Sequence, residues 1–150
     1  MILRHQRGDL KTSIQWSALP LVLSDSLMQL ATAQYFSLRT KKKDGSQVDT
    51  PVWFVPAPEE QTYHVFANIS SGKVKRIRNF AEAYVARCDI RGKVLGEWRA
   101  AHAELVAESD VIYAAFRSKY GLIFRIFDFF SWLGGKHKER QMIKVTINAE

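Results

Sequence analysis

Cysteine is almost absent from this sequence, since Cys88 is the single example in 150 residues. One thiol cannot form an intramolecular disulfide, so oxidation does not stabilise the fold. Cys88 lies in an apolar stretch, where a buried, inert thiol is more common than a nucleophile. Stability must therefore come from a hydrophobic core, and a chain of this length is long enough to form one.

Long uncharged apolar runs are also missing. The most apolar segment, residues 122–133, is too short to span a bilayer and contains Arg125 and Asp128. The first 15 residues carry charges and lack the apolar centre of a signal peptide. We therefore expect a cytoplasmic protein with no membrane partner.

Motifs of nucleophilic and metal catalysis are absent as well. The sequence has no G-x-S-x-G elbow, no G-x-x-x-x-G-K phosphate loop and no G-x-G-x-x-G turn. None of the four histidines has metal-ligand spacing with a cysteine or a carboxylate. These histidines are His5, His64, His102 and His137. If the protein is an enzyme, we expect a bound cofactor to supply the reactive atom.

Positive charge is in excess. Lysine and arginine number 22 against 15 acidic residues, which gives a net charge of +7. This balance indicates anionic partners, such as a cofactor phosphate, nucleic acid or a membrane surface, and does not choose among them. A basic, solvated surface explains it equally well.

The spacing of apolar residues and the positions of turn-forming residues predict a mainly β (α+β) chain that forms one domain over residues 1–150. Six antiparallel strands are expected, at 34–40, 48–55, 62–67, 83–90, 94–107 and 141–148. Asp44-Gly45 indicates a hairpin turn between the first two. Antiparallel sheets of this size commonly close into a barrel, which removes their exposed edges.

Helices are predicted around this sheet. One begins at Ser71 between the third and fourth strands, and two helical stretches run from Ser109 or Asp110 to Trp132. Another short helix, capped by Ser24 or Asp25, is expected through residues 28–33. Residues 1–20 show no period and are interpreted as an N-terminal extension.

The start of the helix after Ser71 has the features of an anion site. Ser71 is a suitable N-cap, and the free N–H groups of a first helical turn point toward any anion there. Gly72 allows a close backbone approach. Lys73 and Arg76, three apart, share one face and reach a phosphate beside the helix end. The alternative is a solvated basic helix with a serine cap.

A second candidate segment is Thr50-Pro51-Val52-Trp53-Phe54. Proline removes a backbone donor, which favours an edge strand or a bulge. Backbone groups near Pro51 are then free for the edge of a ligand ring, with Trp53 as a wall. The alternative is that Trp53 belongs to the core and Pro51 only protects an edge.

Together these segments resemble the pyridoxamine 5'-phosphate oxidase-like FMN-binding split-barrel superfamily, and specifically its F420-dependent branch. The resemblance lies in Tyr35–Thr40, Asp44-Gly45, Thr50–Phe54, Ser71–Asn79, Cys88–Lys93 and Gly96–Trp98, in the expected order. It implies a split β-barrel with short peripheral helices. It also implies a homodimer with two cofactor sites at its interface, where Trp98 approaches from the partner.

The resemblance further implies which residues bind the cofactor. The phosphate is surrounded by Ser71, Lys73, Lys75 and Arg76, with Asn68 at the end of the preceding strand. Thr50, Pro51, Val52 and Trp53 line the ring of the flavin-type group.

Three departures limit the resemblance. Ala67 stands where the family often has a threonine, and Phe80 follows Asn79 where relatives usually have proline. The C-terminal tryptophan and Arg-Leu signature of true pyridoxamine-phosphate oxidases is missing. The resemblance therefore does not extend to vitamin-B6 oxidation.

The function expected from these observations is an oxidoreductase that uses bound F420 or FMN for hydride transfer to or from a small molecule. A carrier or sensor without turnover would use the same binding residues. A nucleic-acid-binding barrel is the third alternative, and no sequence-specific nucleic acid is expected. That alternative would use Arg39, Lys41, Lys42, Lys43, Lys73, Lys75 and Arg76.

Overall fold

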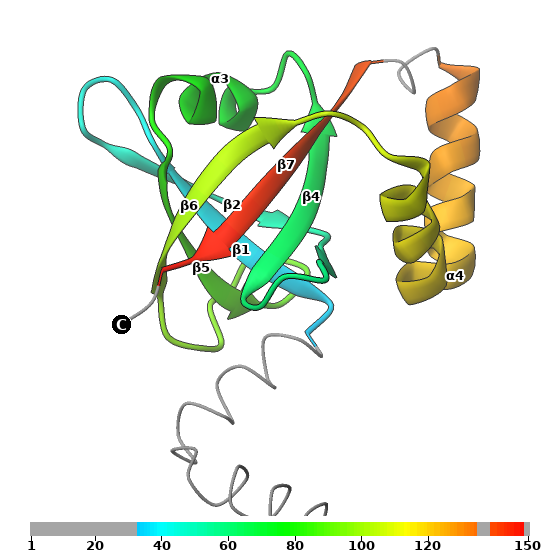
Figure 1. Cartoon of the computed structure of the whole chain (residues 1–150), viewed down its shortest axis with the longest axis horizontal. Coiled ribbons are helices and arrows are strands. Elements are labelled where there is room, and N and C mark those ends of the chain that lie inside the picture. Colours follow the sequence, from blue (N-terminus) through cyan, green and yellow to red (C-terminus); the bar gives the residue numbers. More distant parts are fainter. Residues whose placement is uncertain (1–32, 135–138, 149–150) are drawn as a thin grey trace, which may run out of the picture. The chain divides into compact units, whose positions relative to one another are not determined.

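A computed structural model describes residues 33–134 and 139–148, whose strands form one antiparallel sheet (Figure 1). The strand order is β2-β1-β5-β6-β7-β4-β3. The strands are β1 (Tyr35–Lys41), β2 (Gln47–Val52), β3 (Val55–Pro56), β4 (Thr62–Asn68), β5 (Glu82–Cys88), β6 (Arg99–Val106) and β7 (Arg140–Ile147). The predicted mainly β fold is confirmed.

The sheet curls because its two edge strands are consecutive in the chain. β2 and β3 lie at opposite ends of the strand order, yet only Trp53 and Phe54 separate them. Three extended peptide steps, from Val52 to Val55, span at most about 11 Å. The two edges must therefore approach each other, which gives the split barrel visible in Figure 1.

Alternating side chains fill the interior of this barrel. In β7, the residues Ile143, Val145 and Ile147 are buried, as the alternation in the sequence predicts. Phe54 is fully buried and stacks on Phe36 at 4.4 Å between ring centroids. A chain with one cysteine has no intramolecular disulfide, so burial of these apolar side chains is the main source of its stability.

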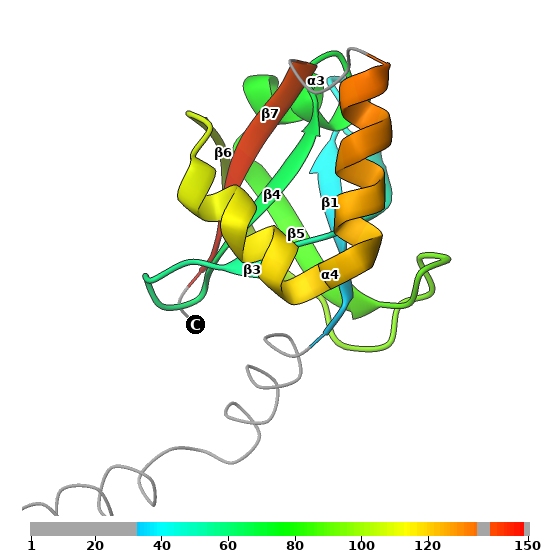
Figure 2. The same ribbon diagram turned by 90° about the vertical axis from the view of Figure 1, so that its right-hand side faces the viewer.

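Two helices of the described residues accompany the barrel. The helix α3 (Gly72–Asn79) lies at one end of it, against β1, β4 and β6 (Figure 1). The helix α4 (Asp110–Leu133) bends at Gly121, whose φ of 59° and ψ of −132° are accessible to glycine. Its two segments meet at an angle in Figure 2. The predicted pair of helical stretches is therefore confirmed.

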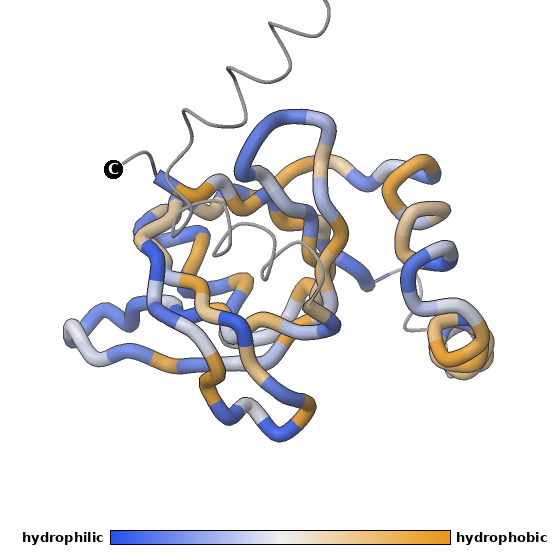
Figure 3. The backbone as a smooth tube through the Cα atoms, turned by 90° about the horizontal axis from the view of Figure 1, so that it is seen from below, coloured by the Kyte–Doolittle hydropathy of each residue, from blue (hydrophilic) through white to orange (hydrophobic). Residues whose placement is uncertain are grey.

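The first segment of α4 and the start of the second cover a second apolar cluster on the outside of the sheet. This cluster contains Val55, Tyr113, Phe116, Phe124 and Met142. Met142 lies on the opposite face of β7 from the barrel interior, and α4 buries it fully. The second segment of α4, seen end-on in Figure 3, is largely hydrophobic.

α4 also holds the link between β2 and β3. The Tyr120 hydroxyl accepts a hydrogen bond from Phe54 N at 2.9 Å and lies 2.8 Å from the carbonyl oxygen of Gln34. Lys119 Nζ donates to the Phe54 carbonyl at 2.8 Å. Trp53 stacks on Tyr120 at 4.9 Å between centroids. Backbone and side chains of the link are therefore bound by one turn of α4.

Two predicted strands had wrong boundaries. The strand expected at 48–55 is divided into β2 and β3, which raises the strand count from six to seven. Most of 94–98 is not strand, and β6 begins at Arg99. Asp89 Oδ1 accepts from Arg91 N and Lys93 N, both at 2.9 Å, which stabilises a loop there. Within 94–98, Val94 alone pairs with a strand, in an isolated bridge to Cys88, whereas β6 pairs with β5 from Arg99 onward.

Some predictions lie outside the described residues. These are the N-terminal extension at 1–20 and the helix expected through residues 28–33, of which Ala33 alone is described. The assignment of 1–150 to one domain stays a prediction.

Replacing Tyr120 by phenylalanine should destabilise the protein. The substitution leaves Phe54 N–H without its acceptor in a half-buried position, which typically costs about 1–3 kcal/mol. Urea unfolding of Tyr120→Phe measures the loss. Tyr84→Phe is the matched control, because its hydroxyl makes a 3.4 Å contact with Glu82 at the surface. Equal losses in both variants would contradict the role of Tyr120.

The contribution of Lys119 to stability should rise between pH 8 and pH 10. Burial lowers the pKa of Lys119 to about 8, below its usual 10.5. The unfolded chain therefore binds more protons than the native chain between these values, and raising the pH favours the native state. Thermal unfolding from pH 7.5 to 9.5 measures this rise as the gain in stability of wild type relative to Lys119→Met. The comparison cancels the opposite contribution of Cys88, because burial raises the pKa of that thiol to about 11 in both proteins. The same substitution at exposed Lys93 should leave the rise intact.

Candidate functional site

One cavity joins the two candidate segments of the sequence. It has a volume of about 370 Å³ and lies between the β2–β3 link, β4, α3 and α4. Its lining residues are Tyr35, Pro51, Val52, Trp53, Phe66, Lys73, Ile90 and Phe127. Pro51, Val52, Trp53 and Lys73 were predicted from the sequence as cofactor-binding residues. We call this space the Trp53 cavity.

Aromatic side chains form the walls of the Trp53 cavity. The face of Trp53 is fixed by its stack on Tyr120, and Phe127 meets its ring edge-on at 5.4 Å between centroids. Phe66 lies 5.9 Å from Phe127. Pro51 is exposed on the edge strand β2, the position at which a missing N–H costs no ladder hydrogen bond. The cavity therefore offers flat apolar walls that suit a planar ring.

The N-terminus of α3 supplies positive charge beside these walls. Ser71 is the N-cap, as predicted, and its Oγ accepts from Val74 N at 3.5 Å. Lys73 lies in the first turn and is half-buried. Burial, and then the nearby guanidinium of Arg76, lower the pKa of Lys73. An anion placed here would relieve both effects.

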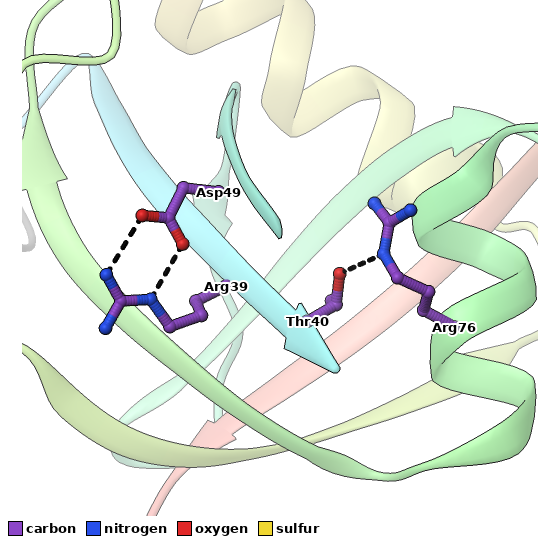
Figure 4. A network of polar contacts seen from close by, with 4 residues as sticks. All are labelled: Arg39, Thr40, Asp49 and Arg76. Atoms are coloured by element: carbon purple, nitrogen blue, oxygen red, sulfur yellow. Dashed lines mark hydrogen bonds and ion pairs between the residues drawn. The ribbon is translucent and has the colours of Figure 1, made fainter. Parts of the chain in front are cut away.

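Arg76 lies against the start of its own helix. Its Nε donates to Thr40 Oγ1 at 2.6 Å (Figure 4), and burial lowers its pKa. A Cβ on Gly72 would lie 2.6 Å from Arg76 Nη1. Gly72 therefore leaves room for the guanidinium of Arg76, whereas the sequence suggested that it lets a ligand approach the backbone.

The remaining predicted residues do not line the Trp53 cavity. Thr50 is half-buried on β2, and Lys75 is exposed on α3. Asn68 instead lines a neighbouring cavity. Trp98 covers Arg39 within the same chain, 3.8 Å from the guanidinium carbon, and Arg39 pairs with both carboxylate oxygens of Asp49 (Figure 4). The contact of Trp98 with a partner's cofactor stays a prediction.

Sequence reasoning missed four residues of the cavity, namely Tyr35, Phe66, Ile90 and Phe127. Phe66 follows Val65 in β4, so strand alternation places it on the outer face. Phe127 stands in a run of aromatic residues that is plain in the sequence. The signal for both was present, but no local pattern brings residues 61 positions apart together.

A second cavity of about 490 Å³ adjoins the first, because Phe66 and Phe127 line both. Its other lining residues are Ala67, Asn68, Phe130, Ser131 and Arg140. We call it the Arg140 cavity.

Other kinds of site find little support in the part of the chain that the structure describes. Over 33–134 and 139–148, no three histidine, cysteine or carboxylate side chains group as metal ligands. No described helix combines the length and apolarity needed to cross a membrane. Two cations proposed for nucleic acid are in ion pairs, Arg39 with Asp49 and Lys41 with Glu82. The absence of sequence-specific nucleic-acid binding stays a prediction.

Comparison with known proteins gives matches to solved structures alone. No family model and no curated protein matches the sequence. A candidate pyridoxamine 5'-phosphate oxidase from Listeria innocua superposes with a TM-score of 0.56 and 16% identity, over 84% of this chain and 93% of that one. An FAD-binding protein from Mesorhizobium loti gives 0.54 and 12%, over 87% and 90%.

A third match is HutZ, the heme storage protein from Vibrio cholerae, with a TM-score of 0.58 and 10% identity, over 82% and 89% of the two chains. At these identities the matches establish the fold and leave the ligand open. The strand order, the curled sheet and these matches agree, and the chain has the split-barrel fold of the pyridoxamine 5'-phosphate oxidase-like proteins.

Proposed function

We propose that the protein is an oxidoreductase that binds a flavin-type cofactor, FMN or F420, in the Trp53 cavity. The observation that carries the proposal is the meeting of aromatic walls with Lys73 at the N-terminus of α3 in one cavity. A flavin-type cofactor combines a planar ring with a phosphate, and the cavity offers a surface for each. The cofactor would supply the atom that accepts or donates hydride.

The residues of the cavity have separate tasks in this proposal. Lys73 and the first-turn N–H groups of α3 bind the phosphate, with Arg76 held beside them by Thr40. Trp53, Phe66 and Phe127 orient the ring and exclude water from it. No side chain is required as an acid or base, which agrees with the absence of a catalytic motif.

Heme is a less suitable ligand for the Trp53 cavity, although one protein of this fold stores it. Heme iron is usually held by histidine, cysteine or methionine, and less often by tyrosine; of these, the described lining contains Tyr35 alone. A carrier or sensor without turnover would use the same flavin site. Steady-state reduction of the bound cofactor by a nicotinamide or by a small-molecule donor would distinguish an enzyme from that alternative.

Lys73→Ala should weaken cofactor binding about tenfold or more, since a charge-assisted contact to phosphate is worth roughly 1.5–3 kcal/mol. Titration of apoprotein with FMN and with F420 measures the loss. Lys75→Ala is the matched control for FMN, because Lys75 is exposed and lies off the cavity.

The same titration distinguishes the two cofactors. F420 carries extra carboxylates beyond the phosphate, so a loss in Lys75→Ala with F420 alone would place that tail along α3. Equal affinities of wild type and Lys73→Ala for both cofactors would reject the phosphate site.

We also propose a homodimer that covers the second segment of α4. Large apolar side chains there are 44–71% exposed, and patches of this kind mark interfaces. They are Leu122, Ile123, Ile126, Phe127, Phe129, Phe130 and Leu133. Because the same segment lines both cavities, a second copy on it would also shield the proposed cofactor site.

Light scattering at micromolar concentration should give about twice 17.2 kDa. Ile126→Asp combined with Phe130→Asp should shift the protein toward the monomer, because two buried, unpaired carboxylates oppose association. Val111→Asp is the control, since Val111 is 79% exposed on the first segment of α4. A wild-type mass near 17 kDa would contradict the dimer.

A further inference from the structure

The Arg140 cavity combines apolar walls with polar groups at one end. Phe66, Phe127 and Phe130 contribute rings, and Asn68 and Arg140 lie directly opposite each other in the β4–β7 ladder. Ser131 adds a hydroxyl from α4. This cavity is lined by no lysine, so its positive charge comes from Arg140, independently of Lys73 in the Trp53 cavity.

Arg140 is a buried cation with an aromatic surround. The residue is 7% exposed at the start of β7. Its guanidinium carbon lies 5.1 Å, 5.5 Å and 5.4 Å from the ring centroids of Phe66, Tyr113 and Phe127. Burying a charge is costly unless it is paired and hydrogen-bonded. The groups that pair with Arg140 therefore indicate whether it has a structural role or binds a ligand.

Protein groups satisfy Arg140 incompletely. Nη1 lies 2.8 Å from Asp128 Oδ1 in an ion pair, whereas Nη2 has no hydrogen-bond acceptor among the described residues. The Tyr113 hydroxyl also lies close to the guanidinium, and it donates to Glu108 at 3.2 Å. Burial and Glu108 raise the pKa of Tyr113 to about 12, and Arg140 acts in the opposite direction.

We propose that the Arg140 cavity binds a flat aromatic molecule that carries a carboxylate. Carboxylate oxygens match the paired N–H groups of a guanidinium, and they would give Nη2 the acceptor that it lacks and replace Asp128 at Nη1. The aromatic body would lie against Phe66, Phe127 and Phe130, which line the cavity. The site does not depend on a flavin, although the two shared walls would place its ligand next to one.

Access to Arg140 involves the second segment of α4. The terminal nitrogens are buried, and Asp128 and Phe127, which contact the guanidinium, both follow the bend at Gly121. The ligand carboxylate therefore competes with Asp128 for the same cation. Removing the charge of Asp128 should strengthen ligand binding, whereas it would not do so if Arg140 only joined α4 to the barrel.

Calorimetric titration of the full chain with 2-naphthoate tests the proposal, with 2-naphthylmethanol as the neutral probe. We expect naphthoate to bind at least tenfold more tightly than the alcohol. Arg140→Gln should remove this preference, and Asp128→Asn should tighten naphthoate binding severalfold. Arg117→Gln removes an exposed arginine of α4 that does not line the cavity, and should change nothing.

Lys73→Ala separates this site from the proposed cofactor site. Naphthoate binding that survives Lys73→Ala while cofactor binding is lost assigns the two ligands to two cavities. The proposal is overturned if the acid and the alcohol bind equally, if folded Arg140→Gln binds like wild type, or if Asp128→Asn does not bind more tightly. The comparison of the two probes on wild type decides the matter even if Arg140→Gln does not fold.

Discussion

Two residues between opposite edges of a sheet constrain this protein more than any other feature. Trp53 and Phe54 connect β2 to β3, and so short a link forces a seven-stranded sheet to bring its edges together. Alternation along the link then sends Phe54 into the barrel and Trp53 outward against Tyr120. The wall of the Trp53 cavity is therefore a direct product of barrel closure.

The helix α4 turns this closure into a site. Tyr120 and Lys119 bind the backbone of the link, and Gly121 then redirects the chain so that Phe127 reaches both cavities. Arg140 meets Asp128 on the same segment. A change in the position of this segment would alter both cavities together, which couples the two proposed ligands through one element.

Sequence reasoning succeeded where the signal is local. The Asp44-Gly45 turn, the Ser71 cap and the alternation of β7 each depend on a few neighbouring residues, and each was confirmed. The four residues Pro51, Val52, Trp53 and Lys73, which the sequence singled out, line one cavity, and their binding of a cofactor stays a prediction. Sequence reasoning missed Phe66 and Phe127, because only the long-range pairing of strands brings them together.

The strand predicted across 94–98 shows a different limit. The composition around Trp98 favours a strand. In the structure, however, the Trp98 ring stacks on the guanidinium of Arg39, and its backbone does not pair with a neighbouring strand. Which partner a side chain finds depends on the assembled sheet. Propensity alone does not contain that information.

The position of β7 has a consequence for how the barrel assembles. This strand follows α4 in the chain, yet it pairs with β4 and β6 in the middle of the sheet, so that Thr62 lies opposite Thr146. Contacts so distant in sequence make folding slow. During synthesis, the edges of β4 and β6 that face β7 stay unpaired until residues 140–147 have been made. In that interval a chaperone or a neighbouring nascent chain could bind these strands.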